Sequence, residues 1–241
     1  MCGICGCSDE THEVENHTHH HTSHSHDNKV LIEQDIMSMN NTFALNNKNY
    51  LAKQKTLALN IMSSPGSGKT TLLAKTISDL KNEIDMSVIV GDQQFNFDAE
   101  KIKSNGGRAI QINTGKACHL DAHTVGHVIA TIPLKERSIL FIENVGNLIC
   151  PAMFNLGENY KVAVLSVAEG DNKPLKYPDM FYAADLMIIT KIDLLPYVDF
   201  DLNKCIEYAR RIKPDIEILS LSSVKGDGLA DWYQWLKQKN I

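Results

Sequence analysis

Residues 63–71 read Ser-Ser-Pro-Gly-Ser-Gly-Lys-Thr-Thr and directly follow an apolar run, residues 56–62, of sequence Thr-Leu-Ala-Leu-Asn-Ile-Met. A buried strand that enters a glycine-rich turn and then an apolar helix is typical of a phosphate-binding loop. Backbone N–H groups in such a loop surround the phosphates of a nucleoside triphosphate. The strict pattern has glycine at the position of Ser63, so the match lacks one residue. The sequence therefore predicts a P-loop fold that binds a nucleoside triphosphate.

Each polar residue of this loop has an expected task. We expect Lys69 to reach the β and γ phosphate oxygens and the Thr70 hydroxyl to hold Mg²⁺. The other nucleotide contacts predicted in the loop are Pro65, Gly66, Ser67, Gly68 and Thr71.

Short apolar runs alternate with amphipathic stretches from residue 56 onward. Strands are predicted near residues 56–62, 86–91, 108–112, 138–143, 161–167, 186–190 and 216–221. Helices are predicted over 70–80, 98–104, 121–131, 200–212 and 227–238. This alternation predicts an α/β fold with a mostly parallel, doubly wound sheet and helices on both faces. Ligands of such sheets bind at the carboxyl ends of the strands.

The chain divides into three parts by composition. Residues 1–28 hold five acidic residues, seven histidines and no lysine or arginine, so they account for the whole formal charge of −5. A segment with so little apolar surface is predicted to be a flexible arm. Residues 29–52 show a helical pattern, and 53–241 form the nucleotide-binding domain. The near-neutral charge of that domain argues against nucleic-acid binding, and the sequence shows neither a membrane span nor a leader, so a cytoplasmic protein is expected.

A second nucleotide motif follows the predicted strand at 186–190. Thr190-Lys191-Ile192-Asp193 resembles the Asn-Lys-x-Asp motif with which GTPases read guanine, with Thr190 in place of asparagine. A carboxylate at the last position accepts hydrogen bonds from both N1–H and N2–H₂ of guanine, whereas adenine offers no matching donor pair. GTP is therefore the predicted nucleotide, with Lys191 and Asp193 at its base. Ser222 and Ser223, after the last strand, are weaker candidates for base contacts.

Carboxylates end two other predicted strands. Glu143-Asn144-Val145-Gly146 resembles the Asp-x-x-Gly switch of GTPases, in which the carboxylate lies near Mg²⁺ and the glycine N–H senses the γ-phosphate. Asp92 ends the strand at 86–91 and is predicted either to approach Mg²⁺ or to cap a helix. Lys69, Thr70, Asp92 and Glu143 are thus the predicted catalytic group. Asn147 stands where small GTPases carry a water-orienting glutamine, so we expect slow intrinsic hydrolysis.

Cysteine and histidine residues suggest two metal sites. Cys118 and His119 are adjacent, and Cys150 lies seven residues after Glu143, so the three supply thiolate and imidazole ligands suited to Zn²⁺ or Ni²⁺. From spacing alone, the default interpretation is a pair of buried cysteines and a capping histidine without a metal. Cys2, Cys5 and Cys7, separated by glycines, could close around one ion. His123 and His127 are expected on a packed or surface helix face that also includes His119.

Three longer stretches carry a family resemblance. They are Gly115-Lys-Ala-Cys-His-Leu-Asp-Ala122, Glu143-Asn-Val-Gly-Asn-Leu-Ile-Cys-Pro151 and Ser166-Val-Ala-Glu-Gly-Asp-Asn-Lys-Pro-Leu-Lys-Tyr-Pro178. Together with the Met-Cys-x-x-Cys-Gly-Cys start, they resemble the signatures of the HypB-type hydrogenase-maturation GTPases. The resemblance covers residues 1–7 and essentially all of the chain from residue 30.

The resemblance implies a function and partners. It implies GTP hydrolysis during Ni²⁺ delivery to the [NiFe]-hydrogenase large subunit, with a HypA-type accessory protein and a homodimer that forms when GTP is bound. It makes Cys118, His119 and Cys150 a nickel or zinc site, and Cys2, Cys5 and Cys7 a tighter nickel site. In the dimer, Lys173 or Lys176 would lie near the phosphates of the neighbouring subunit. Because Cys150 follows the switch, we expect hydrolysis to loosen the metal.

Two other functions fit parts of the pattern. A urease-directed GTPase of similar fold is disfavoured, because its metal motif reads Cys-Pro-His rather than the adjacent pair Cys118-His119. A nickel or zinc storage protein with a structural nucleotide site is the alternative of a different class; it would bind many ions per chain without turning over GTP.

Overall fold

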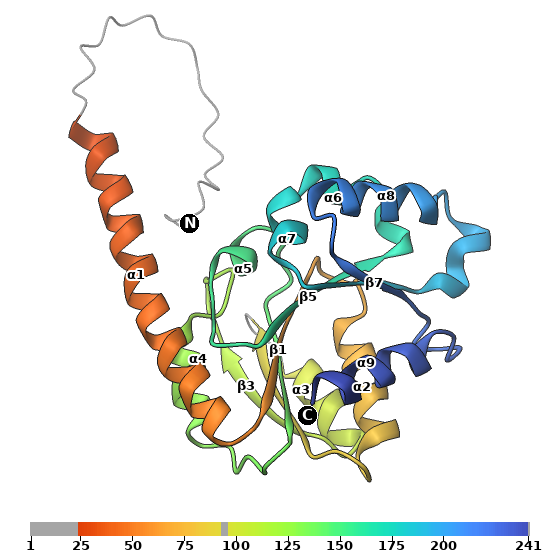
Figure 1. The fold of residues 1–241 in the computed structure, drawn as a ribbon, viewed down its shortest axis with the longest axis horizontal. Coiled ribbons are helices and arrows are strands. Elements are labelled where there is room, and N and C mark those ends of the chain that lie inside the picture. The colour runs from red at the N-terminus through yellow and green to blue at the C-terminus, as the bar shows by residue number, and fades with distance from the viewer. Residues whose placement is uncertain (1–23, 93–95, 241) are drawn as a thin grey trace, which may run out of the picture.

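The computed structural model describes residues 24–92 and 96–240. Its strands form one seven-stranded sheet in the order β3-β2-β4-β1-β5-β6-β7, and every neighbouring pair is parallel (Figure 1). The strands are β1 (Leu57–Ser63), β2 (Met86–Asp92), β3 (Arg108–Asn113), β4 (Ile139–Glu143), β5 (Tyr160–Ser166), β6 (Leu186–Thr190) and β7 (Glu217–Ser220). The predicted α/β P-loop class is confirmed, and the sheet is wholly rather than mostly parallel.

Nine α-helices and two 3₁₀ segments fall within the described residues. They are α1 (His24–Lys53), α2 (Lys69–Leu80), α3 (Phe97–Ser104), α4 (Ala122–Ile129), α5 (Cys150–Met153), η1 (Val167–Glu169), α6 (Lys173–Lys176), α7 (Pro178–Ala183), η2 (Ile192–Tyr197), α8 (Leu202–Ile212) and α9 (Leu229–Lys239). The sequence pattern did not predict α5, α6 or α7. The first helix begins at residue 24 rather than 29, inside the segment expected to be an arm. Residues 1–23 lie outside the described part of the chain.

Both faces of the sheet are buried, which explains the unbroken apolar runs of its strands. Successive side chains of β1 point to opposite faces. Leu57 and Leu59 join a core cluster with α2 and α9, while Ala58, between them, joins a different cluster with α1 and α4. A third cluster packs α7 and α8 against β5 and β6. Figure 1 shows these helices distributed over the two faces.

Helix α1 lies against α4 at the edge of this core (Figure 1). Its Asn47 is buried, and the side-chain Nδ2 donates to the carbonyl oxygens of Ala122 (2.7 Å) and Leu156 (3.0 Å). These bonds fix α1 to two segments that approach the functional site. None of the helices among residues 24–92 and 96–240 is long and apolar enough to cross a membrane.

Candidate functional site

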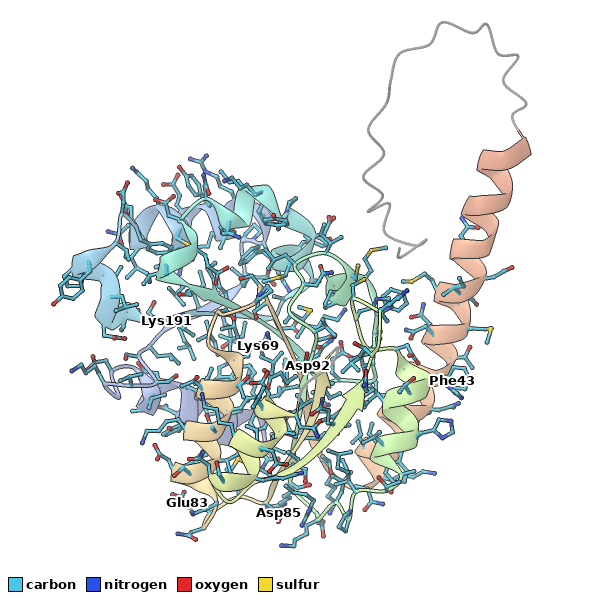
Figure 2. The ribbon with its side chains drawn as sticks, turned by 180° about the vertical axis from the view of Figure 1, so that it is seen from behind. Phe43, Lys69, Glu83, Asp85, Asp92 and Lys191 are labelled. Atoms are coloured by element: carbon cyan, nitrogen blue, oxygen red, sulfur yellow. The ribbon has the colours of Figure 1, made fainter. Side chains whose placement is uncertain are left out.

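A pocket of about 480 Å³ opens at the carboxyl ends of β1, β2 and β4. The predicted phosphate loop forms one side of it, and Asp92, Glu143 and Gly146 form another. Figure 2 shows Lys69, Asp92 and Lys191 at this end of the sheet. The topology therefore brings together residues up to 125 positions apart in the sequence, as the hydrogen bond from Lys191 Nζ to the Gly66 carbonyl oxygen (2.7 Å) illustrates.

Ser63, which replaces the first glycine of the motif, holds the loop lysine. Lys69 Nζ donates to Ser63 Oγ at 2.8 Å, and Ser67 Oγ donates to the same oxygen at 2.6 Å. Burial lowers the pKa of Lys69, and nearby Glu143 partly opposes this effect. Ser67 is itself fully buried, so its hydroxyl is committed to Ser63 and any contact that it makes with a nucleotide would come from its backbone.

Thr70 and Glu143 meet beside the loop. Thr70 Oγ1 donates to Glu143 Oε1 at 2.6 Å, whereas no group of the described residues hydrogen-bonds to the buried Glu143 Oε2. Burial raises the pKa of Glu143 to about 7, although Lys69 and Thr70 act in the opposite direction. A buried carboxylate oxygen without a donor is suited to a cation. Thr70, Asp92 and Glu143 thus fit a bound Mg²⁺, which would neutralise phosphate charge.

Gly146 lies close to the phosphate loop. A Cβ atom built on it would be 3.0 Å from both Cγ and the backbone nitrogen of Pro65, closer than most real contacts of that kind. Glycine at this position therefore lets the switch segment approach the loop, as a γ-phosphate sensor requires.

The raised pKa of Glu143 leads to a stability prediction for the nucleotide-free protein. Between about pH 4.5 and pH 7 the folded state binds more protons than the unfolded state, so the free energy of unfolding falls as the pH rises. We expect this carboxyl to contribute a loss of roughly 3 kcal/mol across that window, at 1.36 kcal/mol per pKa unit. Urea unfolding of wild type and Glu143→Gln at pH 5, 6 and 7, without metal, measures it. The glutamine variant should show a shallower pH dependence, and identical slopes would contradict the prediction.

A second cavity of about 270 Å³ adjoins the loop. Its lining includes Lys191, Asp193, Ser222 and Ser223, the residues predicted to contact the base. Asp193 Oδ1 is buried, and within the described part of the chain it has no hydrogen-bond partner, so it can accept donors from a ligand. Thr190, in place of the usual asparagine, donates from Oγ1 to the carbonyl oxygen of Ser67 (2.6 Å) and thereby ties the base motif to the phosphate loop.

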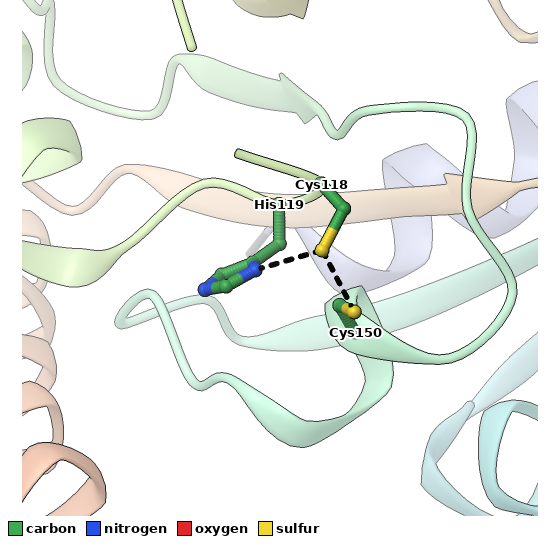
Figure 3. Close-up of side chains that lie close together, drawn as sticks. All are labelled: Cys118, His119 and Cys150. Atoms are coloured by element: carbon green, nitrogen blue, oxygen red, sulfur yellow. Dashed lines mark hydrogen bonds between the residues drawn. The ribbon is translucent and has the colours of Figure 1, made fainter. Parts of the chain in front are cut away.

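Cys118, His119 and Cys150 come together although 32 positions separate the cysteines (Figure 3). Their sulfur and nitrogen atoms all lie within 4.8 Å of one another. The Cys118 thiol donates to Cys150 Sγ at 2.9 Å, and Cys118 Sγ is 3.6 Å from His119 Nδ1. Two thiols and an imidazole in this arrangement can bind Ni²⁺ or Zn²⁺ after the thiols lose their protons.

The surroundings of His119 prepare it as a ligand. Its ring stacks on Phe154 with 3.8 Å between ring centroids, which holds the imidazole in place. Burial lowers its pKa, and this favours the neutral imidazole that binds metals. His119 precedes α4, whose first turn is capped by Asp121 through a bond from Thr124 N–H (2.8 Å). The expectation that His119 shares a helical face with His123 and His127 is therefore wrong.

His123, His127 and Cys205 are not part of this group of ligands. His123 and His127 are exposed on α4 with their Nε2 atoms 3.1 Å apart, hydrogen-bonded to one another. Among the described residues, Cys118, His119 and Cys150 form the one group of three potential ligands. Cys2, Cys5 and Cys7 fall outside the described residues. Cys205 is fully buried in the core.

Two charged residues of the pocket were not predicted from the sequence. Asp98 and Lys101 from α3 line the phosphate pocket, and Lys101 Nζ donates to Thr71 Oγ1 at 2.8 Å. They belong to no recognisable motif, so only the position of α3 beside α2 reveals them. Lys173 Nζ lies 3.8 Å from Glu169 Oε2, and Glu169 also hydrogen-bonds to Ser64 of the loop.

Comparison with known proteins identifies close relatives. Residues 57–220 match the family model described as CobW/HypB/UreG, nucleotide-binding domain. The hydrogenase maturation factor HypB of Azotobacter vinelandii is 53% identical over 210 residues, covering 87% of this chain and 69% of that protein. The Escherichia coli K12 protein of the same name is 53% identical over 206 residues, covering 86% and 71%.

Two solved structures resemble the fold closely. HypB from Helicobacter pylori in complex with nickel superposes with a TM-score of 0.80 at 39% identity, covering 84% of this chain and 95% of that one. HypB from Archaeoglobus fulgidus also gives a TM-score of 0.80 at 39% identity, covering 85% of this chain and 100% of that one.

Proposed function

Because this chain belongs to the HypB family of hydrogenase maturation factors, we propose that it hydrolyses GTP and uses the hydrolysis to release Ni²⁺ during maturation of a [NiFe]-hydrogenase. The proposed parts are a guanine pocket at Asp193, a Mg²⁺ site at Thr70, Asp92 and Glu143, and a Ni²⁺ or Zn²⁺ site at Cys118, His119 and Cys150. Cys2, Cys5 and Cys7 are proposed as a second nickel site in the arm.

One observation carries this proposal: the nucleotide pocket and the metal site share the segment 143–150. Glu143 begins the segment within the phosphate pocket, and Cys150 ends it within the group of metal ligands. Asn147 braces the far end, since its Oδ1 accepts from Ile149 N–H (2.8 Å) and its Nδ2 donates to Cys150 Sγ (3.7 Å). A shift of the segment when the γ-phosphate leaves would therefore move one metal ligand relative to the other two.

The partners are proposed by extension from the family. They are a second copy of this chain when GTP is bound, a HypA-type accessory protein and the hydrogenase large subunit. For the dimer, Lys173 Nζ on α6 lies 3.8 Å from Glu169 Oε2, and Glu169 in turn contacts Ser64, so this corner of the protein adjoins the phosphate loop.

Metal titration in two nucleotide states tests the function. Ni²⁺ binding would be followed by thiolate charge-transfer absorption in a protein with Cys2, Cys5 and Cys7 changed to alanine, bound either to GDP or to a non-hydrolysable GTP analogue. We expect about 5- to 150-fold tighter binding with the analogue, the usual range for coupled sites. Steady-state phosphate release from GTP then tests whether the protein hydrolyses the nucleotide.

A matched pair of cysteine variants makes this test specific. Cys150→Ala should weaken Ni²⁺ binding and remove its dependence on the nucleotide, whereas Cys205→Ala, a buried cysteine of α8 outside the site, should change neither. Equal Ni²⁺ affinity in both nucleotide states would contradict the coupling. Binding of many ions without GTP turnover would instead support metal storage.

A further inference from the structure

A buried asparagine next to Glu143 also connects the two sites. Asn144 follows Glu143, lines the phosphate pocket and is only 1% exposed. Its side-chain Oδ1 accepts from the backbone N–H of Leu120 at 3.1 Å, and its own backbone N–H donates to the Ile61 carbonyl oxygen at 3.0 Å. Leu120 is the residue directly after His119. One amide group therefore joins the switch segment to the loop that carries two metal ligands.

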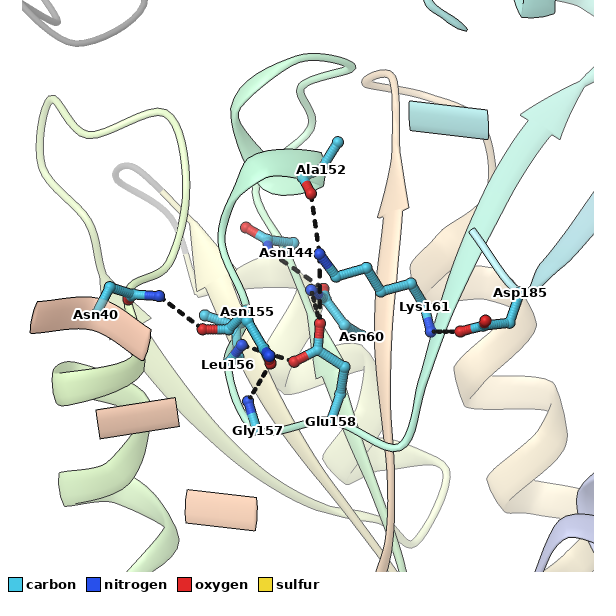
Figure 4. A network of polar contacts seen from close by, with 10 residues as sticks. All are labelled: Asn40, Asn60, Asn144, Ala152, Asn155, Leu156, Gly157, Glu158, Lys161 and Asp185. Carbon is cyan, nitrogen blue, oxygen red and sulfur yellow. Dashed lines mark hydrogen bonds and ion pairs between the residues drawn. The ribbon is translucent and has the colours of Figure 1, made fainter. Parts of the chain in front are cut away.

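The same amide also begins a second route, which Figure 4 shows. Asn144 Nδ2 donates to Asn60 Oδ1 (3.2 Å), and Asn60 Nδ2 donates to Glu158 Oε1 (3.2 Å). Lys161 Nζ lies 3.8 Å from that carboxylate oxygen and donates to the Ala152 carbonyl oxygen (2.9 Å). Ala152 belongs to α5, the short helix that starts at Cys150.

Three of the four side chains in this network are buried, and Lys161 is half-buried. Asn60, Asn144 and Glu158 are 0%, 1% and 8% exposed. Hydrogen bonds in such surroundings are stronger than in water, and a buried amide that loses its partner is left with an uncompensated desolvation cost. The loop that carries Cys118 and His119, and the helix that begins at Cys150, are therefore each expected to follow the switch segment along a separate route.

We propose that Asn144 is the positioning residue that transmits the nucleotide state to both halves of the metal site. It acts through Leu120 on the loop of Cys118 and His119, and through Asn60 and Glu158 on the helix of Cys150. Because the side chain of Asn144 bonds to Leu120 and Asn60, its role is to set the distance between the metal ligands. This inference rests on the proposed function, because it presupposes that metal affinity depends on the bound nucleotide.

The measured quantity is the ratio of Ni²⁺ dissociation constants in the GDP and GTP-analogue states, using full-length protein with Cys2, Cys5 and Cys7 changed to alanine. For Asn144→Ala we expect this ratio to fall to within about 2-fold of unity, while all three core ligands remain. Asn60→Ala cuts only the Glu158 route, so it should retain part of the ratio. Asn60→Ala leaves the sequence of the switch segment unaltered. It therefore provides the test of the network if Asn144→Ala folds poorly.

Asn40 offers a matched structural control. It is 5% exposed, accepts from Ala122 N–H at 2.9 Å and donates to the Asn155 carbonyl oxygen at 2.8 Å. It thus braces neighbouring parts of the same two segments from α1, without a bond to residues 143–150. Asn40→Ala should change Ni²⁺ affinity equally in both nucleotide states and leave the ratio at its wild-type value.

The outcomes separate this inference from the proposed function. A wild-type ratio above unity that persists in both Asn144→Ala and Asn60→Ala would overturn the role of Asn144 and leave the proposed function standing. A ratio that falls equally in Asn40→Ala would also overturn it, because general loosening would then be the cause. A wild-type ratio of unity would refute the coupling itself.

Discussion

Replacing Lys69 with methionine is expected to lower the rate of GTP hydrolysis by about 10²–10³-fold, the usual effect of removing one group that stabilises transition-state charge. Methionine keeps the apolar stem but removes the ammonium. In the nucleotide-free protein this ammonium is buried and bonded to Ser63 Oγ, in the lining of a pocket that also includes Glu143. A γ-phosphate is a stronger acceptor than a hydroxyl, so Lys69 should move to it when the nucleotide binds.

Single-turnover phosphate release at saturating GTP measures this effect separately from binding. Lys75→Met is the matched control, because Lys75 lies on the same helix α2 but pairs with Asp79 at 2.8 Å on the protein surface. That variant should hydrolyse GTP at the wild-type rate. A Lys69→Met protein with near-normal turnover would exclude the lysine from catalysis and remove the main reason to regard the loop as an active site.

Ser63 shows how far the loop could be predicted from its sequence. The motif, its strand and its helix appear within a few residues of their predicted places, because phosphate loops depend on local order in the chain. The sequence shows that Ser63 replaces the glycine of the motif, but it does not show which groups the serine hydroxyl binds. Only the folded loop shows that this hydroxyl accepts from both Lys69 and Ser67.

Short helices and long-range polar contacts were beyond sequence reasoning. Helices α5 and α6 span four residues each, too few for a period of 3.6 residues to be recognised. The bond between Asn60 and Asn144 joins positions 84 apart, and nothing local distinguishes these asparagines from surface ones. The ligand chemistry of Cys118, His119 and Cys150 suggested a metal site, but family resemblance was needed to favour it, since buried cysteines are the default interpretation of their spacing.

Changing Asp193 to asparagine is expected to weaken GTP binding by about 10²–10⁴-fold. The carboxylate accepts two hydrogen bonds from guanine in the proposed complex, each worth about 1.5–3 kcal/mol when one partner is charged. Asparagine would replace one acceptor oxygen by an NH₂ group, which faces a guanine donor. The buried Asp193 Oδ1, unpaired among the described residues, is the atom that this substitution affects most directly.

The same substitution should create a new preference, and this distinguishes lost recognition from damaged structure. Xanthine carries a carbonyl group where guanine carries N2–H₂, so it can accept from the new amide. Competition binding should therefore show that Asp193→Asn prefers xanthosine triphosphate to GTP, the reverse of wild type. Asp199→Asn, an exposed position after the same 3₁₀ segment, should keep the wild-type preference. Loss of both nucleotides in Asp193→Asn would mean that the cavity does not read the base through this residue.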